Sequence, residues 1–323
     1  MNSPAENPLD RILVLEMVRV TEAAAVAASK LIGRGDEKAA DAAAVEAMRK
    51  AFDTLYMDGT VVIGEGERDE APMLFIGEKV GGAPGKGPKI DIALDPLEGT
   101  TITAKAGPNS LAVLAAAAEG CLLNAPDVYM DKLAVGPGYP DGIIDLAKTP
   151  TENVQAVAEA KGVAPSDIIV CVLDRPRHSD LIAELRSLGC GVVLIGDGDV
   201  AGVMHCTDPE TTGIDMYMGS GGAPEGVLAA GALKCLGGQI WGRLLFRNDD
   251  EKGRAAKAGI TDLDRVYSRD EMVTADVIFA ATGVTTGSLV AGLKPRGDSI
   301  ETETLLLRSR TGERRRMTCR HPL

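Results

Sequence analysis

The sequence predicts an α/β protein built from two subdomains. Two amphipathic helical patterns come first, over residues 9–32 and 33–52, and short apolar strand patterns follow them. From about residue 166 strand and helix patterns alternate, which is typical of a sheet with parallel strands. We therefore expect an N-terminal α+β subdomain at residues 1–165 and a C-terminal α/β subdomain at residues 166–323.

The bulk composition narrows the class of function. The chain has 323 residues, of which 45% are hydrophobic and 25% charged, as in a globular protein. Its net charge of −13 argues against a nucleic-acid partner, because nucleic-acid binding needs a basic surface that releases counterions. If such an acidic protein handles an anionic substrate, it needs a local source of positive charge, and a divalent metal is the obvious one.

Cysteine usage and the first residues favour a cytoplasmic protein without a membrane partner. The six cysteines show no CxxC spacing, and several lie in apolar runs such as "IIVCVL", as reduced buried thiols do. The opening "MNSPAENPLD" has neither the basic region nor the apolar region of a signal peptide. No apolar run approaches the roughly 20 residues of a membrane-spanning helix.

The first half of the chain is expected to form the helices just named and then three strands. Residues 59–74, "GTVVIGEGERDEAPML", begin as a strand and run into an acidic loop, and a Gly/Pro connector at 81–89 follows. Residues 89–95, "KIDIALD", alternate like a strand with one buried face. Residues 109–120, "NSLAVLAAAAEG", fit either a strand or a helix, and we favour a strand because they follow a turn.

The second half alternates strongly. Strands are expected in "DIIVCVLD", "CGVVLIG" and "IDMYMGSGG", and helices in "RHSDLIAELRSLG", "DVAGVMHC" and "APEGVLAAGALKCLGG". Residues 302–318 are expected to form a strand, a turn and a strand. The arginines there (Arg308, Arg310, Arg314, Arg315 and Arg316) are either the exposed face of this hairpin or a site for an anionic effector.

Acidic residues follow two of the expected strands. Glu65 opens "EGERDE", which also holds Glu67, Asp69 and Glu70, and Asp95 and Glu98 belong to "DPLEGTT". These strand ends can meet at one sheet edge, where open α/β sheets place their ligands, although an acidic run is also commonly a solvated loop. Carboxylates suit Mg²⁺, and two ions roughly 3.5–4 Å apart can activate a water. The histidines show no zinc-like spacing along the chain, so Mg²⁺ or Mn²⁺ is favoured over Zn²⁺.

The residues after Glu98 fit a phosphate. Gly99 lets the backbone approach an anion closely, and successive N–H groups at a turn can bind its oxygens. Thr100 supplies a hydroxyl that can orient a nucleophilic water. The alternative is that DPxxGT is only a type I turn with Pro at its second position.

"DPLEGTT", preceded by "GEGERDEAPM" and followed by "LNAPDVYMDKL" and "GSGGAPEG", resembles the class II fructose-1,6-bisphosphatases. These belong to the lithium-sensitive, metal-dependent sugar and inositol phosphatase superfamily, and the resemblance runs from about residue 12 to the C-terminus. It implies a sugar phosphatase fold with alternating helix and sheet layers. It implies hydrolysis of the 1-phosphate of fructose 1,6-bisphosphate by direct attack of a metal-activated water, in gluconeogenesis or the Calvin cycle. A homodimer or homotetramer is expected.

The resemblance also implies roles for individual residues. The metal ligands for Mg²⁺ or Mn²⁺ are Asp41, Glu65, Asp95, Glu98 and Glu225. Thr100 resembles the catalytic threonine and acts with Asp41 and Glu65. The substrate contacts are Glu98, Gly99, Thr100, Tyr129, Arg175, Pro176, Arg177, Asp197, Gly198, Asp199 and Gly222.

Without the resemblance, these residues have ordinary structural interpretations. Asp41 would be on a solvated helix face, Tyr129 in the core, "RPR" in an exposed loop and "DGD" in a turn. One departure from the family is Arg175, where members often have Lys, and a guanidinium fork and a point charge are not interchangeable.

Several alternatives stay open at this point. The substrate can be sedoheptulose 1,7-bisphosphate, both bisphosphates or an inositol phosphate. The chain can also be a non-catalytic module that binds a sugar phosphate or senses a metal. A nucleotide-binding oxidoreductase is suggested by "GDGDVAG", but the sequence lacks GxGxxG after a first strand.

Overall fold

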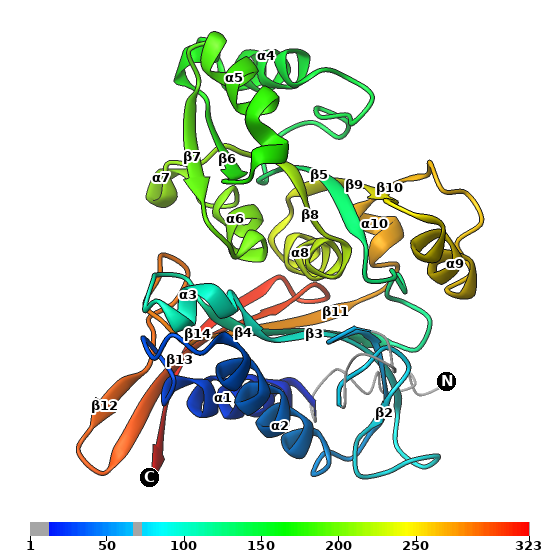
Figure 1. Cartoon of the computed structure of the whole chain (residues 1–323), viewed down its shortest axis with the longest axis vertical. Helices are drawn as coiled ribbons and strands as arrows, with labels where there is room; N and C mark the ends of the chain where they lie inside the picture. Colours follow the sequence, from blue (N-terminus) through cyan, green and yellow to red (C-terminus); the bar gives the residue numbers. More distant parts are fainter. Residues whose placement is uncertain (1–12, 67–72, 323) are drawn as a thin grey trace, which may run out of the picture. The chain divides into compact units, whose positions relative to one another are not determined.

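A computed structural model describes residues 13–66 and 73–322 of the chain (Figure 1). The chain forms two compact units. Unit 1 comprises Met1–Leu122 and Ala275–Leu323, and unit 2 comprises Leu123–Thr274. The boundary expected at residue 165 falls inside unit 2. The division differs because the strands after residue 275 return to the first sheet, a long-range pairing that no local pattern reveals.

Unit 1 contains an eight-stranded mixed sheet in the order β12-β13-β11-β4-β3-β1-β2, with β14 pairing along β13. Its strands are β1 (Asp58–Ile63), β2 (Lys79–Val80), β3 (Lys89–Glu98), β4 (Leu111–Ala118), β11 (Val277–Gly283), β12 (Lys294–Arg296), β13 (Ser299–Arg308) and β14 (Glu313–Pro322). Only β1 and β3 run parallel, and the other described pairs are antiparallel. Its helices are α1 (Leu13–Ser29), α2 (Glu37–Phe52) and α3 (Thr100–Ala104).

The helices α1 and α2 lie side by side against one face of this sheet (Figure 1). Helix α2 begins at Asp36, whose side chain accepts a hydrogen bond from the backbone N–H of Ala39. The two helices, β3, β4 and β11 share one core rich in Ala, Val, Leu and Met. Leu15 lies outside the buried face of α1 and is 46% exposed.

Strand β3 differs from the expectation of one buried face. Asp91 and Ala93 are as buried as their neighbours in β3, which is an inner strand paired with β1 and β4. The Asp91 carboxylate accepts hydrogen bonds from the N–H groups of Gly120 and Cys121. Desolvation nevertheless dominates and raises the pKa of Asp91.

Two other expectations for unit 1 are confirmed. Residues 111–118 form strand β4, with β3 on one side and β11 on the other. Residues 299–322 form the β13–β14 hairpin, and its arginines pair with acids of the same hairpin, as Arg308 and Arg315 do with Glu313. Such pairing is typical of an exposed hairpin face.

Unit 2 contains a six-stranded mixed sheet in the order β10-β9-β5-β8-β6-β7. Its strands are β5 (Tyr129–Val135), β6 (Ile169–Leu173), β7 (Gly191–Ile195), β8 (Met216–Gly222), β9 (Gln239–Leu245) and β10 (Val266–Ser268). The parallel layer expected from the sequence is limited to β7, β6 and β8, because β5, β9 and β10 pair antiparallel.

Helices cover both faces of this sheet (Figure 1). The α-helices are α4 (Pro150–Lys161), α5 (Ser179–Ser187), α6 (Asp199–His205), α7 (Pro209–Thr212), α8 (Ala223–Leu236), α9 (Asp249–Lys257) and α10 (Arg269–Met272). Two 3₁₀ turns, η1 (Pro165–Asp167) and η2 (Pro176–His178), flank β6. Helices α4 and α5 share a core with β5, β6 and β8, and α6 packs against α8. These two units of mixed sheet and helices confirm the α/β fold class.

All six cysteines are free thiols, as expected, and Cys171, Cys190, Cys206 and Cys235 are buried. Within the described residues, none of the helices combines the length and apolar character needed to cross a bilayer.

Candidate active site

In unit 1, the acids singled out from the sequence leave the sheet at one edge. Strands β1 and β3 are parallel and Ile63 pairs with Ala93, so both strands end on the same side. Glu65 follows β1, and Asp95 and Glu98 lie among the last four residues of β3. Glu67, Asp69 and Glu70 lie outside the described residues.

A β-bulge brings the two carboxylates of β3 together. Asp95 pairs with Val113 and Glu98 with Leu111, so that β3 has one more residue than β4 between these pairs. Pro96 lies in the bulge, where strand pairing requires no hydrogen bond from a backbone N–H. The carboxylate oxygens of Asp95 and Glu98 lie within 4.8 Å of each other. The strand therefore continues through Glu98, instead of ending in the expected turn after Asp95.

Asp95 and Glu98 differ in their surroundings. Asp95 is half-buried, and its Oδ1 accepts a hydrogen bond of 2.9 Å from the N–H of Leu97. Glu98 is only 4% exposed. Two acids this close, one of them buried, are costly as bare anions and are stabilised by a shared cation.

Gly99 ends the strand and starts helix α3. Its φ of +86° lies in the left-handed region, which favours glycine. A Cβ at this position would approach Ile102 Cδ1 to 2.8 Å. The half-buried Thr100 is the first residue of α3, where backbone N–H groups have no partner within a helix. The DPxxGT motif is thus a strand bulge followed by a helix start, and the simple type I turn is excluded.

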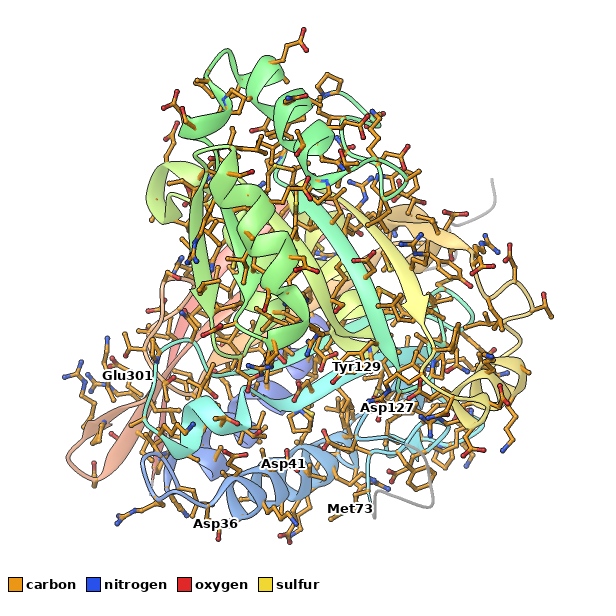
Figure 2. The ribbon with its side chains drawn as sticks, turned by 45° about the horizontal axis from the view of Figure 1, so that its top comes forward. Asp36, Asp41, Met73, Asp127, Tyr129 and Glu301 are labelled. Atoms are coloured by element: carbon orange, nitrogen blue, oxygen red, sulfur yellow. The ribbon has the colours of Figure 1, made fainter. Side chains whose placement is uncertain are left out.

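Asp41 lies on α2, the helix that packs against both β3 and α3 (Figure 2). Its side chain is half-buried, and desolvation raises its pKa. A fully solvated helix face would not produce this shift. Asp41 therefore lies on the helix that packs against the junction between β3 and α3, where Asp95, Glu98 and Thr100 are located.

In unit 2, the residues expected to bind substrate gather at one edge of the sheet. Strands β6, β7 and β8 are parallel, so the segments after them share an edge. Those segments carry Arg175–Arg177, Asp197–Asp199 and Gly222. Tyr129 opens the antiparallel strand β5 and pairs directly with Gly222, so it lies at the same edge (Figure 2). This topology brings together four segments that lie between Tyr129 and Gly222 in the sequence.

The aromatic ring of Tyr129 is flanked by guanidinium groups. Arg177 lies 4.7 Å and Arg247 4.8 Å from the ring centroid. Arg177 also donates to the backbone oxygen and the hydroxyl of Ser220. Arg247 follows β9 and pairs with Glu251, and it was not among the residues expected from the sequence. Its position directly after an apolar strand, like that of "RPR", is the signal that could have identified it.

The other arginine, Arg175, joins the segment after β7. It donates to the backbone oxygen of Gly196 at 2.6 Å and lies 4.0 Å from Asp197. His178 fixes the same loop, because its ring bonds to the backbone oxygen of Leu173 and accepts from the N–H of Ser220. Desolvation lowers the pKa of His178, so the neutral ring is favoured.

A buried lysine supports this edge and was also missed. Lys132 is 1% exposed, pairs with Asp199 and donates to the backbone oxygen of Gly222 at 2.8 Å. Tyr217 donates to the same carboxylate of Asp199 at 3.3 Å. The sequence signal that could have identified it is a lysine inside the apolar strand "YMDKLAV". A lysine buried there needs a partner of opposite charge, because lysine is almost never buried unpaired. Glu225 lies nearby in sequence, in the first turn of α8 after its N-cap Gly222.

Comparison with known proteins identifies the family. The family model described as bacterial fructose-1,6-bisphosphatase, glpX-encoded, matches residues 11–321. The chain belongs to this family, the class II fructose-1,6-bisphosphatases. It is therefore a phosphoric monoester hydrolase of carbohydrate metabolism, and the resemblance seen in the sequence is confirmed.

Curated relatives match over nearly their whole lengths. Fructose-1,6-bisphosphatase 1 class 2 of Escherichia coli (strain K12) is 46% identical over 327 aligned positions, covering 97% of this chain and 96% of the relative. D-fructose 1,6-bisphosphatase class 2/sedoheptulose 1,7-bisphosphatase of Prochlorococcus marinus (strain NATL1A) is 45% identical over 313, covering 93% and 92%. Among solved structures, inositol monophosphatase from Anabaena (Nostoc) sp. PCC 7120 matches with a TM-score of 0.31 and 15% identity, covering 60% of this chain and 71% of that one.

The family consists of metal-dependent phosphatases, and the acids of unit 1 suit such a metal. Asp95 and Glu98 present only oxygen donors, close together and partly removed from water. Hard cations such as Mg²⁺ and Mn²⁺ prefer these ligands.

Proposed function

We propose that this class II fructose-1,6-bisphosphatase hydrolyses the 1-phosphate of fructose 1,6-bisphosphate by direct attack of water. The products are fructose 6-phosphate and inorganic phosphate, made in gluconeogenesis or the Calvin cycle. The observation that carries the proposal is the pairing of Asp95 with Glu98 by the β3 bulge, immediately before Gly99 and Thr100. Family membership supplies the substrate class.

In this proposal, Asp41, Glu65, Asp95, Glu98 and Glu225 hold Mg²⁺ or Mn²⁺. Bound there, the ions supply positive charge that offsets the charge on the phosphate and lower the pKa of water. Four of these acids belong to unit 1, and Glu225 belongs to unit 2, in the first turn of α8. The choice between the two metals follows from the same experiment as the activity.

The chain's own residues orient the reactants. The hydroxyl of Thr100 positions the attacking water, and the carboxylates of Asp41 and Glu65 act as the bases that accept its proton. The first N–H groups of α3 bind phosphate oxygens, because Gly99 opens the helix start to an anion. Direct attack of water needs no covalent phosphoenzyme, and the motif contains no cysteine or histidine that would form one.

The edge of unit 2 binds the sugar and the phosphate that is kept. Arg175 and Arg177 clamp that phosphate, with Arg247 as a third cation beside Tyr129. Asp197 accepts hydrogen bonds from sugar hydroxyls, with Gly198 and Gly222 leaving room for the ligand. Asp199, expected from the sequence to do the same, is buried and paired with Lys132, so its part is to orient this edge. Pro176 restricts the backbone between the two arginines.

A second candidate substrate is sedoheptulose 1,7-bisphosphate. The relative from Prochlorococcus marinus carries both activities in its name, at 45% identity. We place the enzyme in the cytoplasm, where its six free thiols stay reduced, and we expect a homodimer or homotetramer.

The test is a phosphate-release assay on the purified full chain. Fructose 1,6-bisphosphate, sedoheptulose 1,7-bisphosphate and an inositol monophosphate are compared with Mg²⁺, Mn²⁺ or EDTA. Release from the fructose bisphosphate that EDTA abolishes supports the proposal. Release that persists in EDTA, or binding of the sugar phosphate without release, contradicts it, and the second outcome favours the non-catalytic module.

A further inference from the structure

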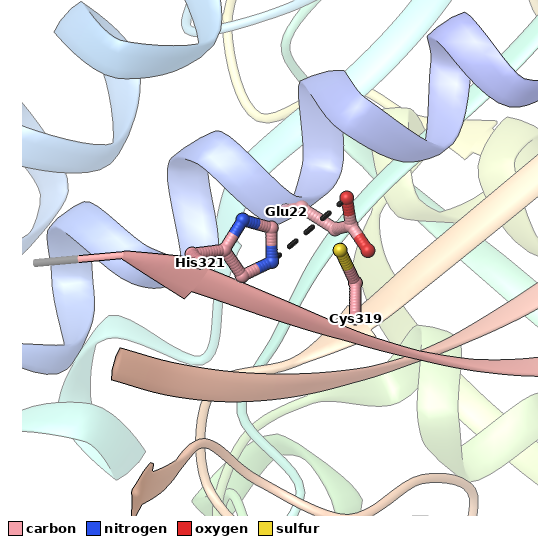
Figure 3. A group of neighbouring side chains, drawn as sticks. All are labelled: Glu22, Cys319 and His321. Carbon is pink, nitrogen blue, oxygen red and sulfur yellow. Dashed lines mark ion pairs between the residues drawn. The ribbon is translucent and has the colours of Figure 1, made fainter. Parts of the chain in front are cut away.

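A second group of side chains with metal-ligand atoms close together lies in unit 1, on a strand and a helix that the active site does not use. It comprises Glu22 on α1 and Cys319 and His321 on β14 (Figure 3). Strands β4, β11 and β13 separate β14 from β3 in the order of the sheet. The group is therefore distinct from the Asp95–Glu98 pair.

Strand geometry aims these side chains at one point. Cys319 and His321 are alternate residues of β14 and so project from the same face. Both are less exposed than their neighbours in β14, and Glu22 of α1 lies on their side of the strand. Thr302 on β13 pairs directly with Cys319 and adds a hydroxyl to the group.

The distances are those of a site that needs little adjustment. The oxygen, sulfur and nitrogen atoms that the three residues offer lie within 4.8 Å of one another. His321 Nε2 lies 4.0 Å from Glu22 Oε2. Ligand atoms on one tetrahedral zinc are about 3.4–3.6 Å apart, given Zn–O, Zn–N and Zn–S lengths of about 2.0–2.3 Å. Side-chain rotations that move each atom by less than about 1 Å close the difference.

Glu22 needs positive charge more than the other members do. It is 4% exposed, and desolvation raises its pKa against the smaller opposing effect of His321. Thr302 Oγ1 donates to Glu22 Oε1 at 3.2 Å and also lies 3.0 Å from His321 Nε2. A divalent cation stabilises the buried carboxylate far better than one hydroxyl does.

We propose that Glu22, Cys319 and His321 bind one Zn²⁺. A thiolate, an imidazole and a carboxylate together suit Zn²⁺ and not the hard Mg²⁺ of the active site. His321 Nε2 exchanges its contact with Thr302 for the metal, while the Thr302 hydroxyl keeps its bond to Glu22 and orients it. A water takes the fourth position, which solvent reaches beside His321, because 27% of that side chain is exposed.

A zinc ion at this site links the edge strand β14 to helix α1. Strand β14 pairs only with β13 among the described strands, whereas α1 belongs to the core of unit 1. Zinc at Glu22 therefore links residues almost three hundred positions apart and holds the end of β14 in place. Binding releases the thiol proton of Cys319, so zinc affinity rises with pH.

Cobalt titration of the full chain is the direct test. The protein is first stripped with a chelator, and Co²⁺ is then added while the charge-transfer absorption of a Co²⁺–thiolate bond is recorded. We expect a band that saturates at one equivalent and that Zn²⁺ abolishes. Cobalt at the carboxylates of the active site gives no thiolate band, so the variant Glu98→Gln keeps the signal even when it is inactive.

Matched variants localise the signal. Cys319→Ser and His321→Gln lose the band and about one equivalent of bound zinc, whereas Cys121→Ser, at the other half-exposed cysteine, keeps both. Thr302→Val weakens zinc binding by about tenfold or more, because it removes only the outer hydrogen bond. A wild-type protein without the band, or a band that survives in Cys319→Ser, overturns the proposal.

A second measurement reports the structural effect. Zinc slows amide hydrogen exchange in the peptides of β14 and α1 in the wild type but not in Cys319→Ser. Equal exchange with and without zinc in the wild type contradicts the proposed fastening. Neither readout depends on catalysis, so failure here leaves the phosphatase mechanism untouched.

Discussion

Replacing Lys132 by Met tests the buried ion pair between Lys132 and Asp199 in unit 2, at the sheet edge proposed to bind the sugar. Lys132 lies in the middle of β5, and its ammonium group contacts the Asp199 carboxylate and the backbone oxygen of Gly222. The side chains of Lys132 and Asp199 are only 1% and 5% exposed. Methionine fills a similar volume but cannot donate, so the change removes the charge and little packing.

The expected loss of stability follows from this burial. Without Lys132, the Asp199 carboxylate remains in the interior with the Tyr217 hydroxyl at 3.3 Å. Removing one partner of such a pair costs about 3–5 kcal/mol, mostly because the other charge stays buried and unpaired. With a urea slope of about 2 kcal/mol per molar, the unfolding midpoint falls by about 2 M.

The chain provides a local probe for the measurement. Its single tryptophan, Trp241 on β9, pairs with Leu133 on β5, beside Lys132. Tryptophan fluorescence during urea unfolding therefore reports on unit 2. The double variant Lys132→Met/Asp199→Asn removes both charges and is expected to recover most of the loss, since neutral pairs of similar shape are tolerated.

Lys252→Met is the matched control. Lys252 pairs with Asp249 on the surface of α9, where the two side chains are 49% and 97% exposed. Such pairs contribute about 0–1 kcal/mol, so the midpoint should barely change. If Lys132→Met unfolds at the same urea concentration as Lys252→Met, the stabilisation assigned to the buried pair is wrong.

Three other predictions concern the active site and acid stability. Thr100→Ala should lower kcat by about 100-fold or more with little change in KM, because only the orientation of water is lost; steady-state phosphate release checks this, and a near-normal kcat contradicts the role of Thr100. Gly99→Ala should destabilise the enzyme by about 1–2 kcal/mol, since its φ is +86° and the new Cβ would meet Ile102 at 2.8 Å; an unchanged Tm refutes the strain. The hydrogen bond from Arg269, more than any other cause, lowers the pKa of Asp270 to about 2. Its stabilisation is therefore present above about pH 4 and is lost as the pH falls through about 2. Asp270→Asn should cost less than about 1 kcal/mol at pH 7, because the carboxylate is largely exposed, and almost nothing near pH 2; a pH-independent difference in urea midpoints contradicts this.

Local patterns predicted most elements but not how the chain divides. Helical spacing was sufficient to predict α1 and α2, and the alternation of strand and helix patterns was sufficient to predict β6, β7 and β8. The sequence left residues 109–120 ambiguous, and pairing with both β3 and β11 decided for a strand. The expected boundary at residue 165 was misplaced because β11 pairs with β4, about 165 residues earlier, and such pairings leave no mark on local periodicity.

The candidate site shows the same limit. The motif around Glu98 predicted its chemistry, but the bulge that joins Asp95 to Glu98 became visible only in the register with β4. Lys132, His178 and Arg247 were missed, because each acts through a partner brought near by the sheet of unit 2. Their residue types alone have common structural explanations.

The amino-acid sequence by itself determined the family, the reaction class and the residue types of the proposed phosphate site, because those depend on short motifs whose members are neighbours along the chain. Tertiary structure alone decided which distant side chains meet. Glu22 and His321 carry no zinc-like spacing, yet α1 and β14 bring them within 4.0 Å. Strand register and helix packing set such distances, and both are long-range properties of the folded chain.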